Sequence, residues 1–348
     1  MSTEAAKPPP PQANVSIESV LGVQQHNVWQ RIAAAQSFWV TVALIIICIV
    51  MSFLQPASFA TPENFYNITR NFSFIGIMAL GMTAVIATGG IDLSVGSIMG
   101  FVAVASGLTL EAGYAWWAAV VVGLAAGLVV GLVNGLIIAY LELSPFVTTL
   151  GMLAIARSGA VVLSGNRMLY KFGPGGPQFK NLGGGELLLG HSFSLSYPLL
   201  FLIVLTAVLA VVYKMTSWGR YVLAIGGNEQ AALLTGVPVK RVKVQVYIVS
   251  GLAAALAAIL NVGWSGSAIN ALGTSYELLA ISAAVIGGAN LMGGEASAYG
   301  AFIGAALIFV IRNSLLMAGV DSNWQGTFVG VFLIAAVYLG KIRGAKRE

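Results

Sequence analysis

Long apolar runs, separated by short polar or glycine-rich breaks, fill most of the chain after its first 36 residues. A helix that crosses a membrane needs about 20 predominantly apolar residues, and ten runs approach this length. They predict an all-α, polytopic transmembrane bundle of about ten spans over residues 37–341. The expected spans are residues 37–55, 69–88, 94–110, 115–141, 146–164, 197–215, 244–263, 276–293, 297–317 and 325–341.

The polar segments between and around these runs predict the rest of the organisation. Residues 1–36 contain four consecutive prolines and few large apolar side chains, which is typical of a disordered tail. Residues 165–196 are rich in glycine and proline and form the longest predicted outer loop, with room for short helices or hairpins. Residues 217–243 carry several charges between two apolar runs, and residues 342–348 form a short basic tail.

The composition excludes a soluble domain. Hydrophobic residues make up 58% of the chain and charged residues only 8%, whereas soluble domains carry about 25% charged residues. A chain this poor in charge cannot cover a surface that faces water. The net charge of +5 comes from loops and tails, without a basic run interleaved with aromatic residues, so nucleic-acid binding is not expected. The single cysteine, Cys48, cannot form a disulfide within one chain.

Lysine and arginine are unevenly distributed over the predicted loops, and this sets the orientation. With the N-terminus in the cytoplasm, most basic residues fall in the tails and in loop 217–243, and the reverse orientation would place this larger group outside. We therefore expect both termini and loop 217–243 to be cytoplasmic and loop 165–196 to be external. The basic residues that would then lie outside are Arg70, Arg167, Lys171 and Lys180.

Loop 217–243 carries the signals of a short helix exposed outside the membrane. Asn228 is placed to cap this helix, and Glu229 follows at its start, where the helix dipole favours a negative charge. Gly236 and Pro238 are placed to end it. Two interpretations remain: an ordinary basic cytoplasmic loop, or an ordered helix that is presented to a partner.

Two stretches share the pattern Gly-Gly-x-[Asp/Asn]-Leu-x-x-Gly where one apolar run ends and the next begins. The pattern predicts an internal repeat with a broken helix in each half. Paired glycines allow a helix to end, and the polar residue can bond the freed backbone groups. Chance similarity in a chain rich in glycine and alanine is the alternative. The candidate residues are Gly89, Gly90 and Asp92 in the first copy and Gly287, Gly288 and Asn290 in the second.

A few polar side chains fall within or beside the predicted spans. Asp92 can cap the helix that follows it or act in a proton or ion relay, and the scarcity of other acids in the spans favours the cap. Asn134 can bond across helices or face a substrate, and helix contact is the default. Arg157 and Arg312 are expected to anchor helices. Trp264 is expected in an aromatic belt at the outer interface rather than stacked on a sugar.

Four stretches resemble the membrane-spanning permease subunits of bacterial ATP-binding-cassette importers for monosaccharides, the ribose-type permeases. The wider set of related proteins includes branched-chain amino-acid permeases. The resemblance covers most of the chain after about residue 40. The stretches are GMTAVIATGGIDLSVGSIMG at 81–100, PFVTTLGMLAIARSG at 145–159, GRYVLAIGGNEQAALLTGVPVKRVK at 219–243 and ELLAISAAVIGGANLMGGEAS at 277–297.

The resemblance implies a division of labour between this chain and its partners. Loop 217–243 would contain a coupling helix that docks on a separate ATPase subunit. ATP and Mg would bind to that ATPase, because this chain has no G-x-x-x-x-G-K-[ST] motif; the chain itself would be no enzyme and would hold no cofactor or metal. A second permease copy in a homodimer, a periplasmic sugar-binding protein and the bacterial inner membrane would complete the assembly. The candidate ATPase contacts are Gly227, Asn228, Glu229, Ala231, Ala232 and Gly236.

The resemblance also implies the function, which is translocation of a monosaccharide, a ribose-like pentose or a hexose, by alternating access. One alternative is another small solute carried by the same machinery: a branched-chain amino acid, a nucleoside or a furanose-like signal molecule. The other is an ion-coupled secondary transporter. A sugar site would gather polar and aromatic side chains, and the spans offer few. The candidate pathway residues are Gly89, Gly90, Asp92, Asn134, Gly287, Gly288 and Asn290.

Overall fold

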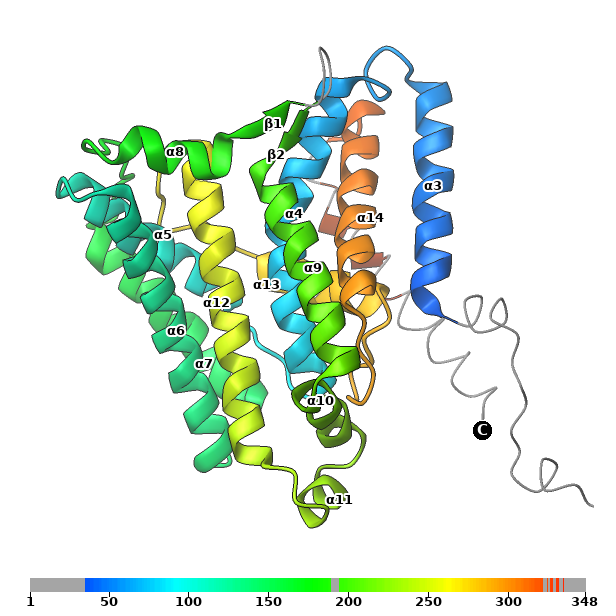
Figure 1. Ribbon diagram of the computed structural model, residues 1–348. Helices are drawn as coiled ribbons and strands as arrows, with labels where there is room; N and C mark the ends of the chain where they lie inside the picture. Colours follow the sequence, from blue (N-terminus) through cyan, green and yellow to red (C-terminus); the bar gives the residue numbers. More distant parts are fainter. Residues whose placement is uncertain are drawn as a thin grey trace, which may run out of the picture. The chain divides into compact units, whose positions relative to one another are not determined.

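The computed structural model describes residues 35–188 and 194–321, together with residues 324, 326, 327, 330, 331 and 334. The chain from Gln36 onward is a bundle of helices (Figure 1), which confirms the predicted all-α class. The predicted tails 1–36 and 342–348 lie almost wholly outside the described residues, and so does most of the predicted span 325–341.

Most of the described helices are long and apolar enough to cross a membrane, which confirms a polytopic membrane protein. In the described part, these are α3 (Gln36–Leu54), α4 (Pro62–Ala87), α6 (Trp116–Tyr140), α7 (Pro145–Ser164), α9 (Tyr197–Met215), α12 (Val239–Ser265) and α14 (Ala298–Met317). The shorter elements are α5 (Val95–Glu111), α8 (Gly176–Gly184), β1 (Glu186–Leu188), β2 (Ser194–Ser196), α10 (Ser217–Gly227), α11 (Glu229–Leu234) and α13 (Tyr276–Ile286).

Two helices differ from the predicted spans for local reasons. α4 begins well before residue 69, because Thr61 Oγ1 accepts a hydrogen bond from Asn64 N at 3.1 Å and Pro62 suits the first helical turn. α13 ends at Ile286, so the span predicted over 276–293 was wrong in its second half. The backbone turns at Gly288, where φ is 105°, while the apolar run continues through the turn.

α4 and α12 form the centre of the bundle, whereas α3, α7 and α9 leave most of their apolar surface exposed (Figure 1). Glycines allow α12 to approach α6 closely, as expected for helices packed in lipid. A Cβ on Gly131 would lie 2.5 Å from the carbonyl oxygen of Tyr247. Gly127 and Gly251 are paired in the same interface, so this packing leaves no room for side chains between the two backbones.

Residues 165–196 contain the short helix α8 and a hairpin of β1 and β2, in which Glu186 pairs with Ser196 in an antiparallel register. α8 packs on the end of α12, where a Cβ on Gly183 would overlap the carbonyl oxygen of Leu260. Figure 1 shows α8 and the hairpin at the opposite end of the helices from α10 and α11.

Candidate functional site

The short helix predicted in loop 217–243 is present as α11. Asn228 has an extended backbone (φ −160°, ψ 105°), and its Oδ1 accepts a hydrogen bond from Ala231 N at 2.9 Å. Gly236, with φ 85°, turns the chain away after the last helical residue, Leu234. The predicted cap and the predicted end of this helix are therefore confirmed. The sequence did not predict α10, which precedes α11 directly and is capped by Thr216, whose Oγ1 accepts from Gly219 N at 3.2 Å.

The structure changes which residues of α11 face outward. Ala232 is only 4% exposed and packs into this chain's own core, so its methyl group is not presented to a partner. Glu229 is already paired within the chain, because Lys243 Nζ donates to its carboxylate at 2.7 Å. Leu233 and Leu234 are 62% and 88% exposed. The sequence analysis did not single out this leucine pair. Residues one or two positions apart in a helix do not share a face, so the two leucines that follow the buried Ala232 point in other directions.

The turn between α6 and α7 lies beside the start of α12. Lys240 Nζ donates to Glu142 Oε1 at 3.0 Å, which joins the α6–α7 turn to α12. This hydrogen bond, together with the charge of Lys240, lowers the pKa of the Glu142 carboxyl. Glu142 adopts a left-handed backbone (φ 54°), which is uncommon outside glycine.

The first Gly-Gly motif ends α4 as predicted. Gly89 has φ 77°, and Gly90 N donates to Val85 O at 3.1 Å, which closes the last turn of the helix. Asp92 Oδ1 then accepts a hydrogen bond from Ser94 N at 3.0 Å. Ser94 is the N-cap residue of α5, so Asp92 bonds the residue before the helix and does not cap its first turn as expected. The bond satisfies a backbone group freed by the break.

Asp92 also links three helices inside the bundle. Ser94 Oγ donates to Oδ1 at 2.6 Å, and Ser250 Oγ of α12 donates to Oδ2 at 2.8 Å. Asn134 Nδ2 of α6 donates to Ser94 Oγ at 2.9 Å. Asp92 and Asn134 are both 0% exposed, so in this conformation they hold α5, α6 and α12 together. The helix contact expected of Asn134 is therefore present, and the pathway role of both residues stays a prediction.

The second motif ends its helix with the same kind of turn, but the left-handed residue is the second glycine of the pair and not the first. Gly288 has φ 105°, and Ala289 N donates to Ala284 O at 3.0 Å. Asn290 Oδ1 accepts from Met292 N at 3.0 Å, which matches the contact of Asp92 with Ser94 N. Asn290 is exposed, unlike Asp92.

Other groups hold the ends of the second break. Gln36 Nε2 donates to Val285 O at 3.2 Å and to Ile286 O at 3.1 Å, so the start of α3 satisfies the last carbonyls of α13. A Cβ on Gly287 would overlap the backbone of Gly300 in α14. The buried Gly287 is thus a packing glycine, and the chain reverses at Gly288.

The remaining polar candidates have structural partners. Arg157 NH1 donates to the carbonyl oxygens of Asn270 and Leu272, which anchors α7 to the α12–α13 connection as expected. The guanidinium of Arg70 lies 4.5 Å from the ring centroid of Trp264. This contact covers a face of the indole on which a sugar would stack.

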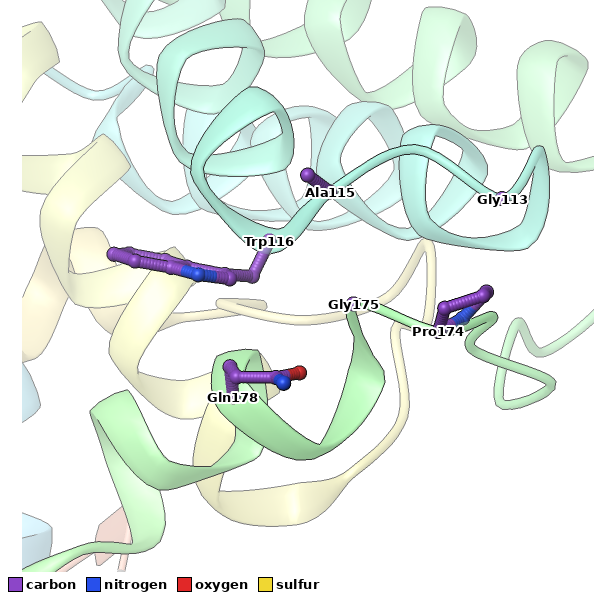
Figure 2. A pocket seen from close by; sticks show the side chains of 6 residues that line it. All are labelled: Gly113, Ala115, Trp116, Pro174, Gly175 and Gln178. Atoms are coloured by element: carbon purple, nitrogen blue, oxygen red, sulfur yellow. The ribbon is translucent and has the colours of Figure 1, made fainter.

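A shallow cavity of about 240 Å³ opens between the α5–α6 turn and the start of α8. Figure 2 shows the side chains around it, with Trp116 from α6, Gln178 from α8 and Pro174 just before α8. Ligand pockets usually enclose about 300–1,000 Å³, so this recess is too small for a typical ligand site and lies at the end of the helices. Among the residues described, no three His, Cys, Asp or Glu side chains are grouped to hold a metal ion.

Comparison with known proteins places these features in a transporter family. The family described as the permease component of branched-chain amino acid transport systems matches residues 64–337. A ribose import permease protein of Bacillus subtilis is 35% identical over 302 residues, which are 87% of this chain and 92% of the relative. A probable ABC transporter permease protein of Sinorhizobium fredii is 36% identical over 290 residues, or 82% and 83% of the two chains.

An autoinducer 2 import system permease protein of Escherichia coli is 35% identical over 274 residues, which are 77% of this chain and 81% of the relative. No solved structure matches the chain. The matched region contains both helix breaks and the whole of loop 217–243, and the relatives confirm the resemblance to ribose-type permeases. The chain therefore belongs to the family of branched-chain amino acid transport system permease components.

Proposed function

We propose that the chain is the permease subunit of an ATP-driven importer that carries a monosaccharide, a ribose-like pentose or a hexose, across the bacterial inner membrane by alternating access. Membership of a permease family and relatives named for ribose import support the proposal. The observation that carries it is α11, a capped helix outside the apolar spans that exposes two leucines.

The partner at α11 is a separate ATPase, which binds the ATP and Mg that drive transport. Leu233 and Leu234 are the anchors in this proposal, since fully burying one leucine contributes about 1.5–3 kcal/mol and both are exposed side by side in sequence on a helix outside the apolar spans. Gly227, Asn228 and Ala231 are exposed as well and remain contact candidates. Glu229 and Gly236 act by holding the shape of the helix, through the Lys243 pair and the left-handed turn.

Two further partners complete the proposed assembly. The apolar faces of α3, α6, α7 and α9 are exposed in the single chain. Lipid covers these faces, except where a second permease copy packs to form a homodimer around one pathway. A periplasmic sugar-binding protein delivers substrate at the end that carries α8 and the hairpin. Both termini and α11 lie on the cytoplasmic side in this arrangement, as the distribution of basic residues predicts.

A furanose-like signal molecule is the second candidate substrate. It is favoured by the relative named for autoinducer 2 import, which is as similar to this chain as the ribose permease of Bacillus subtilis. The spans carry few polar side chains for choosing between sugars, so the binding protein makes the selection in either case.

The experiment that tests the proposal is purification of the tagged chain from native membranes, followed by identification of the proteins that accompany it. We expect an ATPase to co-purify and Leu234→Asp to reduce its recovery by about tenfold or more, because loss of the leucine contact removes more than about 1.4 kcal/mol. Leu188→Asp is the matched control, since Leu188 is 69% exposed on β1 at the opposite end.

Two outcomes would contradict the proposal. One is equal recovery of the ATPase with Leu234→Asp and Leu188→Asp, which would remove α11 from the interface. The other is uptake by the isolated chain in proteoliposomes under an ion gradient and without any ATPase, which would make the protein a secondary transporter.

A further inference from the structure

Two elements that flank α11 reach the first helix break from different sides. α10 leads into α11 and α12 leads away from it. α11 is joined firmly to both, since Asn228 ends α10 and caps α11, and Lys243 of α12 is paired with Glu229. A displacement of α11 would therefore move α10 and α12 together.

The contact from α10 is made by Gly226. A Cβ on this residue would overlap the carbonyl oxygen of Ala87, the last residue of α4, and the amide nitrogen of Gly294. It would also lie 2.9 Å from Gly293 Cα. Gly294 N donates to Ala87 O at 3.0 Å, so the loop of the second break is bonded to the end of α4. The backbone of α10 thus packs directly on the bond that joins the two breaks.

The contact from α12 is made about three turns after the start of this helix. Ser250 Oγ donates to Asp92 Oδ2 at 2.8 Å. One turn earlier, the hydroxyl of Tyr247 lies against Gly90, where a Cβ would be 2.6 Å away. Asp92 in turn holds the start of α5 through Ser94. The first break is therefore held between α10 on one side and α12 on the other.

We propose that Gly226 and Ser250 are positioning residues through which the ATPase moves the first helix break during transport. This inference rests on the proposed docking of an ATPase at α11. The break is the point where α4 and α5 can reorient, because it has no continuous helical hydrogen bonds, and close packing transmits a displacement without a flexible intermediate. The glycine is required at position 226 for approach and not for backbone conformation, since its φ is outside the left-handed region.

Gly226→Ala tests this proposal, with Gly151→Ala on α7 as the matched control. Both are helical glycines, but a Cβ on Gly151 meets nothing within 4 Å, and Gly151 lies outside loop 217–243. The complex of permease and ATPase, in nanodiscs, is followed by hydrogen–deuterium exchange with and without ATP and vanadate. Protection of residues 228–236 by the ATPase reports docking, and the nucleotide-dependent change at residues 87–94 reports transmission.

We expect Gly226→Ala to keep the protection of residues 228–236 and to reduce the nucleotide-dependent change at residues 87–94 by about fivefold or more, as for a coupling lost between two sites. Gly151→Ala should behave as wild type. An unchanged response at 87–94 in Gly226→Ala overturns the inference. Loss of protection at 228–236 in the wild-type complex instead overturns the docking on which it rests.

Ser250→Ala provides a second test that does not depend on tolerance of the added methyl group. It removes one hydroxyl from the α12 contact and adds no atoms. We expect it to lower the nucleotide-dependent change at residues 87–94 while α11 stays protected. If Gly226→Ala is not monodisperse after purification, a wild-type response in Ser250→Ala is sufficient to overturn the inference.

Discussion

At the scale of single residues, the two helix breaks use one chemical device in two environments. Asp92 and Asn290 each accept a hydrogen bond from the backbone amide two residues later, at 3.0 Å in both cases. Asn290 is exposed and makes this local contact, whereas Asp92 is buried and also receives the hydroxyls of Ser94 and Ser250. The same position in the repeat thus bonds the backbone after the helix break in both halves and joins helices in the first half only.

This difference predicts unequal costs of substitution. Asp92→Leu should lower the unfolding free energy by about 1–3 kcal/mol for each donor left without an acceptor, whereas Asp92→Asn keeps an acceptor for Ser94 and should cost under about 1 kcal/mol. Asn290→Ala should be as mild, because water can replace its contact. Thermal unfolding of the purified variants in detergent measures the order. Normal stability of Asp92→Asn combined with loss of ATP-driven uptake would contradict a structural role and support an ion relay.

At the scale of elements, the sequence was sufficient to predict features set by neighbouring residues, but not features set by residues far apart in the chain. Asn228, Gly236 and the two glycine pairs act on their own backbone, so their spacing was sufficient to predict where helices start and end. α13 was predicted too long because an apolar run does not reveal a left-handed turn inside it. α10 was missed because its residues fall in the segment assigned to a loop. The bond between Asn134 and Ser94 joins residues 40 positions apart and has no local signature. Nor does an apolar pattern distinguish the exposed Leu234 from a buried leucine.

The α6–α12 interface gives a prediction about packing. Gly131→Ala should lower the unfolding free energy by about 1–3 kcal/mol, because its methyl group would be forced against the backbone of Tyr247 in a core that has no space for it. Gly151→Ala on α7 is the control, as a Cβ there meets nothing within 4 Å. It should be neutral or gain about 0.5–1 kcal/mol from helix propensity. The midpoints of thermal unfolding of the two variants, measured under the same conditions, test this prediction. Equal midpoints would contradict close packing at Gly131.

At the scale of the whole molecule, the helical bundle separates two sets of features. α8 and the β1–β2 hairpin lie at one end, and α10 and α11 lie at the other (Figure 1). The distribution of lysine and arginine had placed loop 165–196 outside and loop 217–243 inside. Two segments assigned to opposite sides of the membrane by charge are therefore found at opposite ends of the helices, as their predicted placement on opposite sides requires.

Cysteine labelling in intact cells tests that orientation directly. In a Cys48→Ala background, which removes the only native cysteine, Leu188→Cys and Leu234→Cys place thiols on side chains that are 69% and 88% exposed at the two ends. A maleimide that does not cross the inner membrane should label position 188 in intact cells and position 234 only after the inner membrane is opened. The reverse pattern would show the opposite membrane topology, with α11 on the periplasmic side, where no ATP is available. Labelling at both positions before permeabilisation would show that the probe enters the cell; equal reaction of both thiols in detergent confirms that the difference reflects topology rather than thiol reactivity.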